Sequence, residues 1–373
     1  MTDLITHLSN ITDPRSALGK RHQLVDIIII AICGIICGAD DWVMIEYFGK
    51  AKKEWFESFL SLPHGIPSHD TFGQVFSLIN PQEFEKCFMD WVQEIAIMTK
   101  GQLIALDGKT VRRSHDRTNG KAAIHLVSAW ATHNGVVMGQ MKVDDKSNEI
   151  TAIPELLKML EIEGCIISID AMGTQKEIVS TILEQKGDYL LAVKQNQGQL
   201  FQQIDFAFSI DRKNDFKDAP YDYAKTVEKN HGRIETRKCW VTSDPEYIRY
   251  VDPEGNWESL KSVVIIEATR KEGDKTTSQS RYFISSLQVG AAQIMKHIRQ
   301  HWEIENKLHW SLDVTFREDE SRVRVGNAPE NLALIRKMAF NLLRQNKSKK
   351  CGAKTKRMLC AMDTNFLLEV LNS

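Results

Sequence analysis

Two short apolar runs in the middle of the chain each end on an aspartate. Residues 103–106 are followed by Asp107, and residues 166–169 are followed by Asp170. The length of these runs and their Ile and Leu content are typical of buried β-strands. Because the carboxyl ends of parallel strands meet at one crevice, we expect the two carboxylates to lie together. Such a pair favours a hard divalent cation.

A third acid lies in a stretch with helical periodicity, residues 291–310. Ile298, Trp302, Glu305 and His309 share one face of this predicted helix. A carboxylate on a mostly apolar and aromatic face is costly to bury unpaired, and a metal ion would neutralise it. Glu303 competes for this role, but it points to a different face of the helix.

Residues 1–98 predict an all-helical domain. The apolar run from Ile27 to Ala39 has 13 residues, fewer than the ~20 that a membrane span needs, so we interpret it as a buried helix. A helix capped by Ser68 and another opened by Asn80-Pro81 follow. Two such helices around a tight turn form either a DNA-reading helix-turn-helix or a small packing domain.

From residue 99 the pattern predicts an α/β core. The expected elements are strands at 103–107, 122–130 and 136–143, with a hairpin at Asn134-Gly135, then helix 150–162, strand 166–170, helix 175–186 and strand 189–194. This order is that of a ribonuclease-H-like (retroviral-integrase-like) core, with the first strand central and the fourth parallel beside it. Residues 99–204 form its first part.

The remaining residues are expected to form an insertion in the α/β core and then the helices that complete the core. Residues 205–288 are rich in charge and turn residues, with candidate strands at 234–242, 262–269 and 281–286. We interpret them as a β-rich insertion. Residues 289–373 are then expected to supply the helix with Glu305, further C-terminal helices and a basic tail.

An Asp-Asp-Glu set on two strands and a late helix suggests a nuclease or transposase core. The surrounding motifs also resemble bacterial insertion-sequence DDE transposases, in the group that includes the H-repeat-associated proteins of Rhs elements. The resemblance covers nearly the whole chain, and its motifs include LDGKTVR, DAMGTQ, HGRIETR, WEIENKLHW and GNAPENLALIRK. It implies that Asp107, Asp170 and Glu305 are catalytic and hold two Mg²⁺ ions, as in two-metal-ion phosphoryl transfer, with Mn²⁺ as a substitute. The WxIE pattern selects Glu305 over Glu303.

The chain departs from the wider superfamily around this glutamate. Ile298 and His301 occupy the positions of a Tyr and an Arg, and Leu312 that of a Lys. Other residues near Glu305 therefore have to contact the DNA end. Our candidates are Arg299, Lys307 and His309.

Net charge of −1 does not indicate a nucleic-acid binder, but the cations are clustered. Such clusters are either solvated surface or phosphate contacts. Candidate DNA contacts are Lys109, Arg112 and Arg113 beside Asp107, Lys194 and Asn196 after the strand at 189–194, and, through the resemblance, Arg233 and Arg237. A loop cap is the alternative for Lys194 and Asn196.

Seven cysteines without paired spacing favour buried thiols in a reducing, cytoplasmic compartment. A nucleotide cofactor is not expected, because the phosphate-loop motif would need Gly at position 103, which is Leu. The resemblance implies metal-dependent cleavage at transposon ends and strand transfer into double-stranded target DNA. It also implies a DNA-binding domain at residues 1–98, a homodimer or larger assembly on DNA, no membrane association and a place at the nucleoid. A nuclease without joining activity and a silent DNA-binding relic remain as alternatives.

Overall fold

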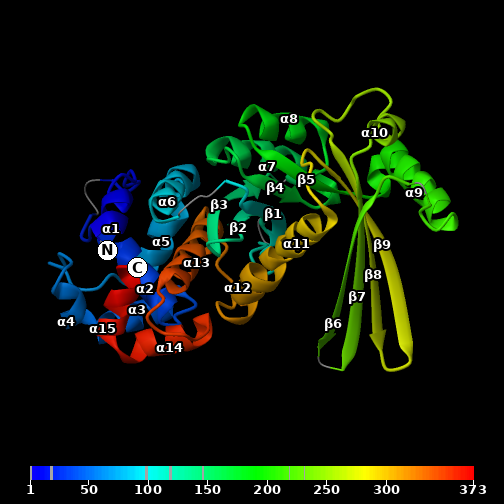
Figure 1. Ribbon diagram of the computed structural model, residues 1–373. Helices are drawn as coiled ribbons and strands as arrows, with labels where there is room; N and C mark the ends of the chain where they lie inside the picture. The colour runs from blue at the N-terminus through cyan, green and yellow to red at the C-terminus, as the bar shows by residue number, and fades with distance from the viewer. Residues whose placement is uncertain are drawn as a thin grey trace. The chain divides into compact units, whose positions relative to one another are not determined.

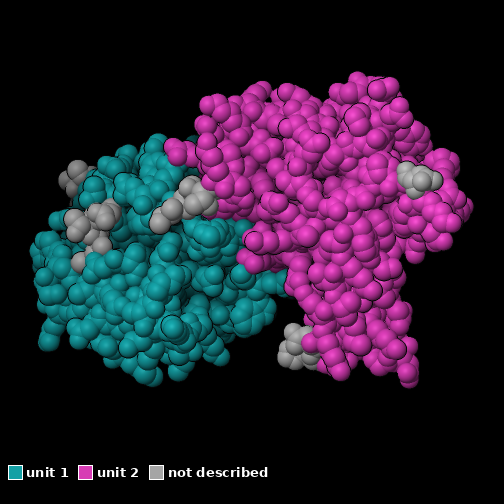
Figure 2. Space-filling model, in the orientation of Figure 1, with its two compact units in different colours: residues 1–97, 108–146, 305–373 teal, residues 98–107, 147–304 magenta. Residues whose placement is uncertain are grey.

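The structure, a computed structural model, describes residues 2–16, 20–96, 100–116, 120–144, 147–217, 219–230 and 232–373. It contains two compact units (Figure 2). Unit 1 comprises residues 1–97, 108–146 and 305–373, and unit 2 comprises residues 98–107 and 147–304. The C-terminal helices thus belong with the N-terminal ones, and residues 205–288 belong with the core strands. The predicted boundary at residues 98–99 lies outside the described residues.

Unit 1 is built mainly from helices around one hairpin. Its helices are α1 (Thr2–Leu8), α2 (Leu24–Ile36), α3 (Trp42–Ala51), α4 (Lys53–Glu57), α5 (His69–Leu78), α6 (Pro81–Ile95), α12 (Trp310–Val314), α13 (Ala328–Gln345), α14 (Ala353–Met362) and α15 (Thr364–Leu371). Its hairpin strands are β2 (His125–Ala131) and β3 (Val136–Val143).

The core of unit 1 forms around two helices that are buried along most of their length, α2 and α13 (Figure 1). The apolar run predicted as a buried helix is confirmed, because residues 27–36 are all buried within α2. Gly34 permits close packing with α3, since a Cβ there would lie 3.1 Å from Cγ1 of Ile45. None of the helices in the described ranges is long and apolar enough to span a bilayer.

The predicted hairpin is also confirmed. β2 and β3 pair antiparallel from His125↔Val143 to Ala131↔Val136, and Gly135 takes a positive φ of 67° in the turn. The asparagine side chain of Asn341, on α13, then pairs with a residue of β3. Its Nδ2 donates to Val137 O at 2.8 Å, and its Oδ1 accepts from Val137 N at 2.9 Å.

Unit 2 holds an extended sheet with helices packed on it. Its strands are β1 (Leu103–Thr110, whose last three residues belong to unit 1), β4 (Ile166–Ile169), β5 (Asp188–Val193), β6 (Asp222–Asn230), β7 (Arg233–Thr242), β8 (Ser262–Glu272) and β9 (Lys275–Ser285). Its helices are α7 (Glu149–Met159), α8 (Lys176–Glu184), α9 (Gly198–Lys213), α10 (Pro245–Val251) and α11 (Ala291–His301).

The strand order in unit 2 is β1-β4-β5-β9-β8-β7-β6. β4 is parallel to both β1 and β5, as predicted. The β-rich residues are continuous with this sheet, because β9 pairs antiparallel with β5 through Leu190↔Ser285 and the three pairs after it. The predicted insertion therefore extends the core sheet.

This region contains more secondary structure than the sequence predicted. Strand β6 and helices α9 and α10 were not predicted, and β9 begins at Lys275, well before the predicted residue 281. The reason is the exposure of these segments. Residues 270–280 are all exposed, so no alternation of apolar and polar positions marks them as strand.

Candidate active site

The two predicted aspartates follow the paired residues of two adjacent parallel strands. Asp107 lies within β1, which continues to Thr110, and Asp170 comes directly after β4. The pairing of β1 with β4 runs from Leu103↔Ile166 to Leu106↔Ile169, so Asp107 and Asp170 occupy corresponding positions, one residue farther along. Adjacent strands lie roughly 4.8 Å apart, and residues in register point to the same side of the sheet. Both side chains are half-buried. The predicted parallel pairing of the two strands is confirmed.

The Asp170 carboxylate is oriented by the backbone that follows it. Its Oδ1 accepts hydrogen bonds from Met172 N at 3.0 Å and from Gly173 N at 3.4 Å, which caps a short 3₁₀ turn, η2 (Ala171–Gly173). Gly173 is needed there, because a Cβ would lie 2.3 Å from Ile169 Cγ2. The turn thus fixes the direction of the carboxylate at the end of β4.

A histidine that sequence reasoning did not select stands near Asp170. His301 ends α11 and is half-buried. Burial lowers the pKa of His301 to about 4, although the negative charge of Asp170 and a hydrogen bond with the backbone of Ser168 act in the opposite direction. The imidazole is therefore neutral at pH 7. The sequence signal that could have selected His301 was its place at the position where the wider superfamily has an Arg.

The predicted helix 291–310 is interrupted where it carries Glu305. α11 ends at His301, and a π-helical turn, η4 (Ile304–His309), precedes α12. The single helical face predicted for Ile298, Glu305 and His309 is therefore wrong, because the π turn breaks the α-helical spacing, and Glu305 is exposed. Single π turns inside helices are frequent at functional sites.

The carboxylates of Asp107 and Asp170 fit a divalent cation. They are two hard oxygen donors on neighbouring strand ends, and Mg²⁺ binds through one or two carboxylates together with water and phosphate oxygens. Both residues belong to unit 2, whereas Glu305 belongs to unit 1. Within the part of the chain that the structure describes, no three His, Cys, Asp or Glu side chains are grouped closely enough to hold a metal ion.

Lys109, a predicted DNA contact, forms ion pairs with three carboxylates of the protein. Its Nζ lies 2.7 Å from Asp313 Oδ1, 3.0 Å from Glu318 Oε2 and 3.2 Å from Asp319 Oδ1. Burial lowers the pKa of Lys109, but the attraction of Glu318 and Asp313 outweighs it and the net shift is upward. The ammonium is held by carboxylates of unit 1. Beside it, Arg112 is exposed and pairs with Asp319 at 3.1 Å.

Of the two predicted DNA contacts after β5, Asn196 caps a loop and Lys194 is an exposed cation. Asn196 Nδ2 donates to Ala171 O at 2.7 Å, so the amide holds the turn that follows Asp170. The alternative prediction of a loop cap describes Asn196 correctly. Lys194 is exposed. It remains a candidate for phosphate contact.

Three predicted arginines are engaged by glutamates. Arg233 Nε lies 3.0 Å from Glu235 Oε1, and Arg237 Nη1 lies 3.2 Å from Glu228 Oε2. Arg299 also pairs with Glu228. These guanidinium groups form an ion-pair network on β6, β7 and α11, which does not favour them as free phosphate ligands.

The other predicted contacts differ in burial. Arg113 and Lys307 are exposed, whereas burial lowers the pKa of His309 to about 4, with the positive charges of Lys337 and Lys109 adding to the effect. A neutral imidazole carries no charge to attract phosphate. His309 is therefore not supported as a cationic contact.

The basic C-terminal segment, residues 344–357, is partly buried. Lys356 Nζ donates to Leu343 O at 2.9 Å, and Arg357 Nη2 donates to Ile35 O at 2.8 Å. Both side chains are buried. They stabilise helix ends in unit 1, and only the remaining lysines of this segment are exposed to solvent.

Helices α5 and α6 flank a two-residue turn, as the helix-turn-helix hypothesis requires. The exposed residues of α6, however, are mainly acidic or neutral: Gln82, Glu83, Lys86, Gln93 and Glu94. Lys86 is engaged by Asp90 at 2.6 Å. Such a helix would repel phosphate, which favours the alternative of a packing domain.

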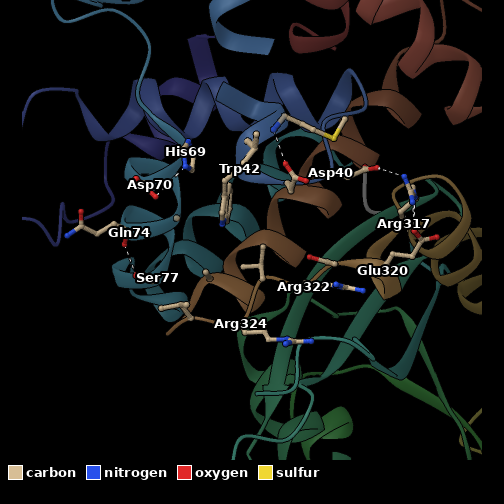
Figure 3. A pocket seen from close by; sticks show the side chains of 18 of the residues that line it. Asp40, Trp42, His69, Asp70, Gln74, Ser77, Arg317, Glu320, Arg322 and Arg324 are labelled. Carbon is tan, nitrogen blue, oxygen red and sulfur yellow. Dashed lines mark hydrogen bonds and ion pairs between the residues drawn. The ribbon is translucent and has the colours of Figure 1, made fainter. Parts of the chain in front are cut away.

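A pocket of about 1010 Å³ lies within unit 1, between α3, α5 and residues 317–328 (Figure 3). Two of its three arginines are engaged by protein groups, and the third, Arg322, is exposed. Arg317 pairs with Glu320, and Arg324 Nε donates to Arg113 O at 3.1 Å. Neither Asp107 nor Asp170 lines this pocket.

Comparison with known proteins decides the family. Residues 98–342 match the family model described as Transposase DDE domain, and residues 5–92 match the model described as DDE_Tnp_1-associated. The chain belongs to the DDE transposase family. The resemblance stated from the motifs is thereby confirmed.

Full-length relatives support this membership of the transposase family. The chain is 44% identical over 374 residues to "Putative transposase YncI" of Escherichia coli O157:H7, covering 99% of this chain and 94% of the relative. It is 41% identical over 375 residues to "H repeat-associated putative transposase YhhI" of Escherichia coli (strain K12), covering 99% and 97%.

A solved structure gives a weaker likeness. The cryo-EM structure of a piggyBac transposase synaptic complex with hairpin DNA matches with a TM-score of 0.43 and 13% identity, covering 100% of this chain and 80% of that chain. We draw no argument from a likeness at this level.

Proposed function

We propose that this member of the DDE transposase family cleaves DNA at transposon ends and joins those ends to target DNA, with Asp107, Asp170 and Glu305 as its metal-binding and catalytic residues. The observation that supports the proposal is the parallel pairing of β1 with β4, whose last pair, Leu106↔Ile169, directly precedes Asp107 and Asp170. Ligands bind at such strand ends in α/β folds.

Support for a ribonuclease-H-like core comes from the strand arrangement. β4 and β5 follow β1 in parallel, and β2 and β3 form an antiparallel hairpin in unit 1. Glu305 is assigned as the third acid because residues 98–342 match the family and because it lies in the π turn.

The two aspartates share one task. Asp107 and Asp170 bind the Mg²⁺, and the backbone bonds to Asp170 Oδ1 hold one carboxylate in a fixed direction. Bound Mg²⁺ supplies charge neutralisation at the scissile phosphate and acidifies a water. Neutral His301 fills the space beside Asp170 without adding a charge that would compete with the cation. The substrate is double-stranded DNA, and the joining of two ends calls for at least a dimer.

The test is a Mg²⁺ or Mn²⁺ assay on labelled DNA carrying the ends that flank the gene, with Asp170→Asn as the inactive control. Joined products that require those ends and disappear in the variant support the transposase. Cleavage without joining would indicate a nuclease, and end-specific binding without chemistry would indicate a relic. Calorimetry in which Asp107→Asn binds Mn²⁺ as tightly as the parent would contradict the metal assignment.

A further inference from the structure

The outer halves of β6–β9 form an arm of the sheet in unit 2. In Figure 1 the strands continue well beyond the end that carries α9 and α10. Residues 270–280 are all exposed, and on β6 the side chains of Lys225, Val227 and Lys229 are exposed. Antiparallel sheets usually cover one face with a core. The outer end of the arm lies beyond the contacts that α11 makes with β6 and β7, and its exposure needs a reason in its surface chemistry.

The strand register sorts the charged side chains of this arm onto two faces. Directly paired residues point to the same side. Lys225 pairs with Lys238, and Lys229, Ile234 and Lys271 form a row across three strands. We call the side that carries Lys225, Lys229, Lys238 and Lys271 the lysine face. The opposite side, the arginine face, carries Arg233, Arg237 and Arg270.

The arginine face is neutralised internally. Arg270 Nη2 lies 2.7 Å from Glu272 Oε2, and Arg233 and Arg237 pair with Glu235 and Glu228 as described above. Each guanidinium group of this face thus has a carboxylate partner on the same side. Little positive charge remains there for an external anion.

The lysine face is not neutralised. Among the described residues of the arm, its one acid is Glu267, which is buried and pairs with Arg212 of α9 at 2.7 Å. None of the four lysines forms an ion pair with any residue that the structure describes. Lys225 and Lys238 lie directly opposite each other. Like charges in that position destabilise a sheet, so an anion bound there would relieve the repulsion.

The spacing of the lysine face suits a polyanion. The row with Lys225 and the row with Lys229 are four residues apart, or ~13 Å along the strand. Between them lies a row with the hydroxyl side chains of Thr236, Thr269 and Ser278. Lysine and hydroxyl donors are the groups that contact phosphate oxygens in protein–DNA complexes. Several phosphates of one duplex would fall within reach.

We propose that the lysine face of β6–β8 binds the sugar–phosphate backbone of duplex DNA. This inference rests on the proposed function and deepens it. It moves the DNA contact of the β-rich region from Arg233 and Arg237 to the other side of the same strands. The contact is electrostatic and independent of base sequence, so it holds the duplex without selecting the transposon end.

The experiment measures binding of the full chain to a fluorescein-labelled duplex of unrelated sequence, by anisotropy, in EDTA and at several salt concentrations. Lys229→Ala/Lys271→Ala is compared with Arg233→Ala/Arg270→Ala, which removes the same charge from the same end of the arm but from the arginine face, where both groups are paired with glutamates. Each phosphate contact contributes about 0.9 to the slope of log K against log salt. The lysine double variant should therefore lose roughly 1.8 from the slope, and the control should lose little.

A Lys229→Arg/Lys271→Arg variant should keep the parent slope, because the charge is retained. Equal losses in the lysine variant and its control, or no loss in either, overturn the lysine face while the parent still binds DNA. A change in sedimentation without DNA in the lysine variant overturns it in favour of a contact between copies. If the parent itself does not bind DNA, the proposed function fails as well.

Discussion

Lys109 and Glu318 form an ion pair at 3.0 Å across 209 residues of sequence. Glu318 is 1% exposed. Burial raises the pKa of Glu318, but the positive charge of Lys109 reverses the effect and the pKa is lowered overall. Lys109 follows Asp107 by two residues, so this pair attaches the end of β1 to the segment after α12.

We predict that Lys109→Ala is mainly a stability variant. Removal of one partner from a buried ion pair leaves the other charge uncompensated and costs about 3–5 kcal/mol. Urea unfolding should show this loss, and Lys109→Met/Glu318→Gln should recover much of it. Lys109→Ala protein that remains folded should keep the salt slope of DNA binding. A lower slope with unchanged stability would restore Lys109 as a phosphate contact.

Glu305→Gln and Glu303→Gln should separate the two glutamates of the π-helical region. Loss of a metal-binding acid removes several kcal/mol of transition-state stabilisation, so Glu305→Gln should slow Mg²⁺-dependent cleavage at least about a hundredfold. Glu303→Gln is the matched control and should cleave at close to the parent rate. DNA affinity in EDTA should be equal for both. The reverse order of activities would assign the role to Glu303.

Asp26 should make stability depend on pH. Its side chain is 4% exposed within α2, and burial raises the pKa of Asp26 to about 6. The folded state therefore holds the proton more tightly than the unfolded state, whose pKa is about 3.9. This group's contribution is fully present below about pH 4 and falls by roughly 3 kcal/mol as the pH rises through 6.

Asp26→Asn should remove that part of the pH dependence. Thermal melts at pH 5 and pH 8 measure it: the variant should gain in Tm over the parent at pH 8 and gain less at pH 5. An equal difference at both values would show that Asp26 does not titrate in this range.

Asn341 should be needed to hold β3 on α13. Asn341→Leu would leave the buried N–H and C=O of Val137 without their side-chain partner, at about 1–3 kcal/mol for each group. Unfolding experiments should therefore show a loss of roughly 2–6 kcal/mol for the two groups together. Asn341→Asp should also be destabilised at neutral pH, because Asn341 is fully buried and an ionised carboxylate there would face Val137 O without a donor. Stability should recover as the pH falls, because the protonated carboxyl again has an O–H to donate. Equal stability of Asn341→Leu and the parent would show that the two bonds contribute nothing net.

Local pattern by itself determined much of the fold. Short apolar strands before Asp107 and Asp170, the Asn134-Gly135 turn and the buried helix from Leu24 are each set by interactions within a few residues, and the structure contains all of them. The motifs likewise led to the DDE transposase family. Periodicity failed at Glu305, because a π turn changes the spacing without any change in composition.

Only the tertiary structure decided which charges are available. Lys109, Arg237 and Arg357 are alike as cations in the sequence, but each is engaged by groups that come from other strands or helices. Lys229 and Lys271, which no motif marked, share an open face because strand pairing places them on the same side. Charge is fixed by residue type, whereas its neutralisation depends on partners that folding brings together from distant parts of the chain.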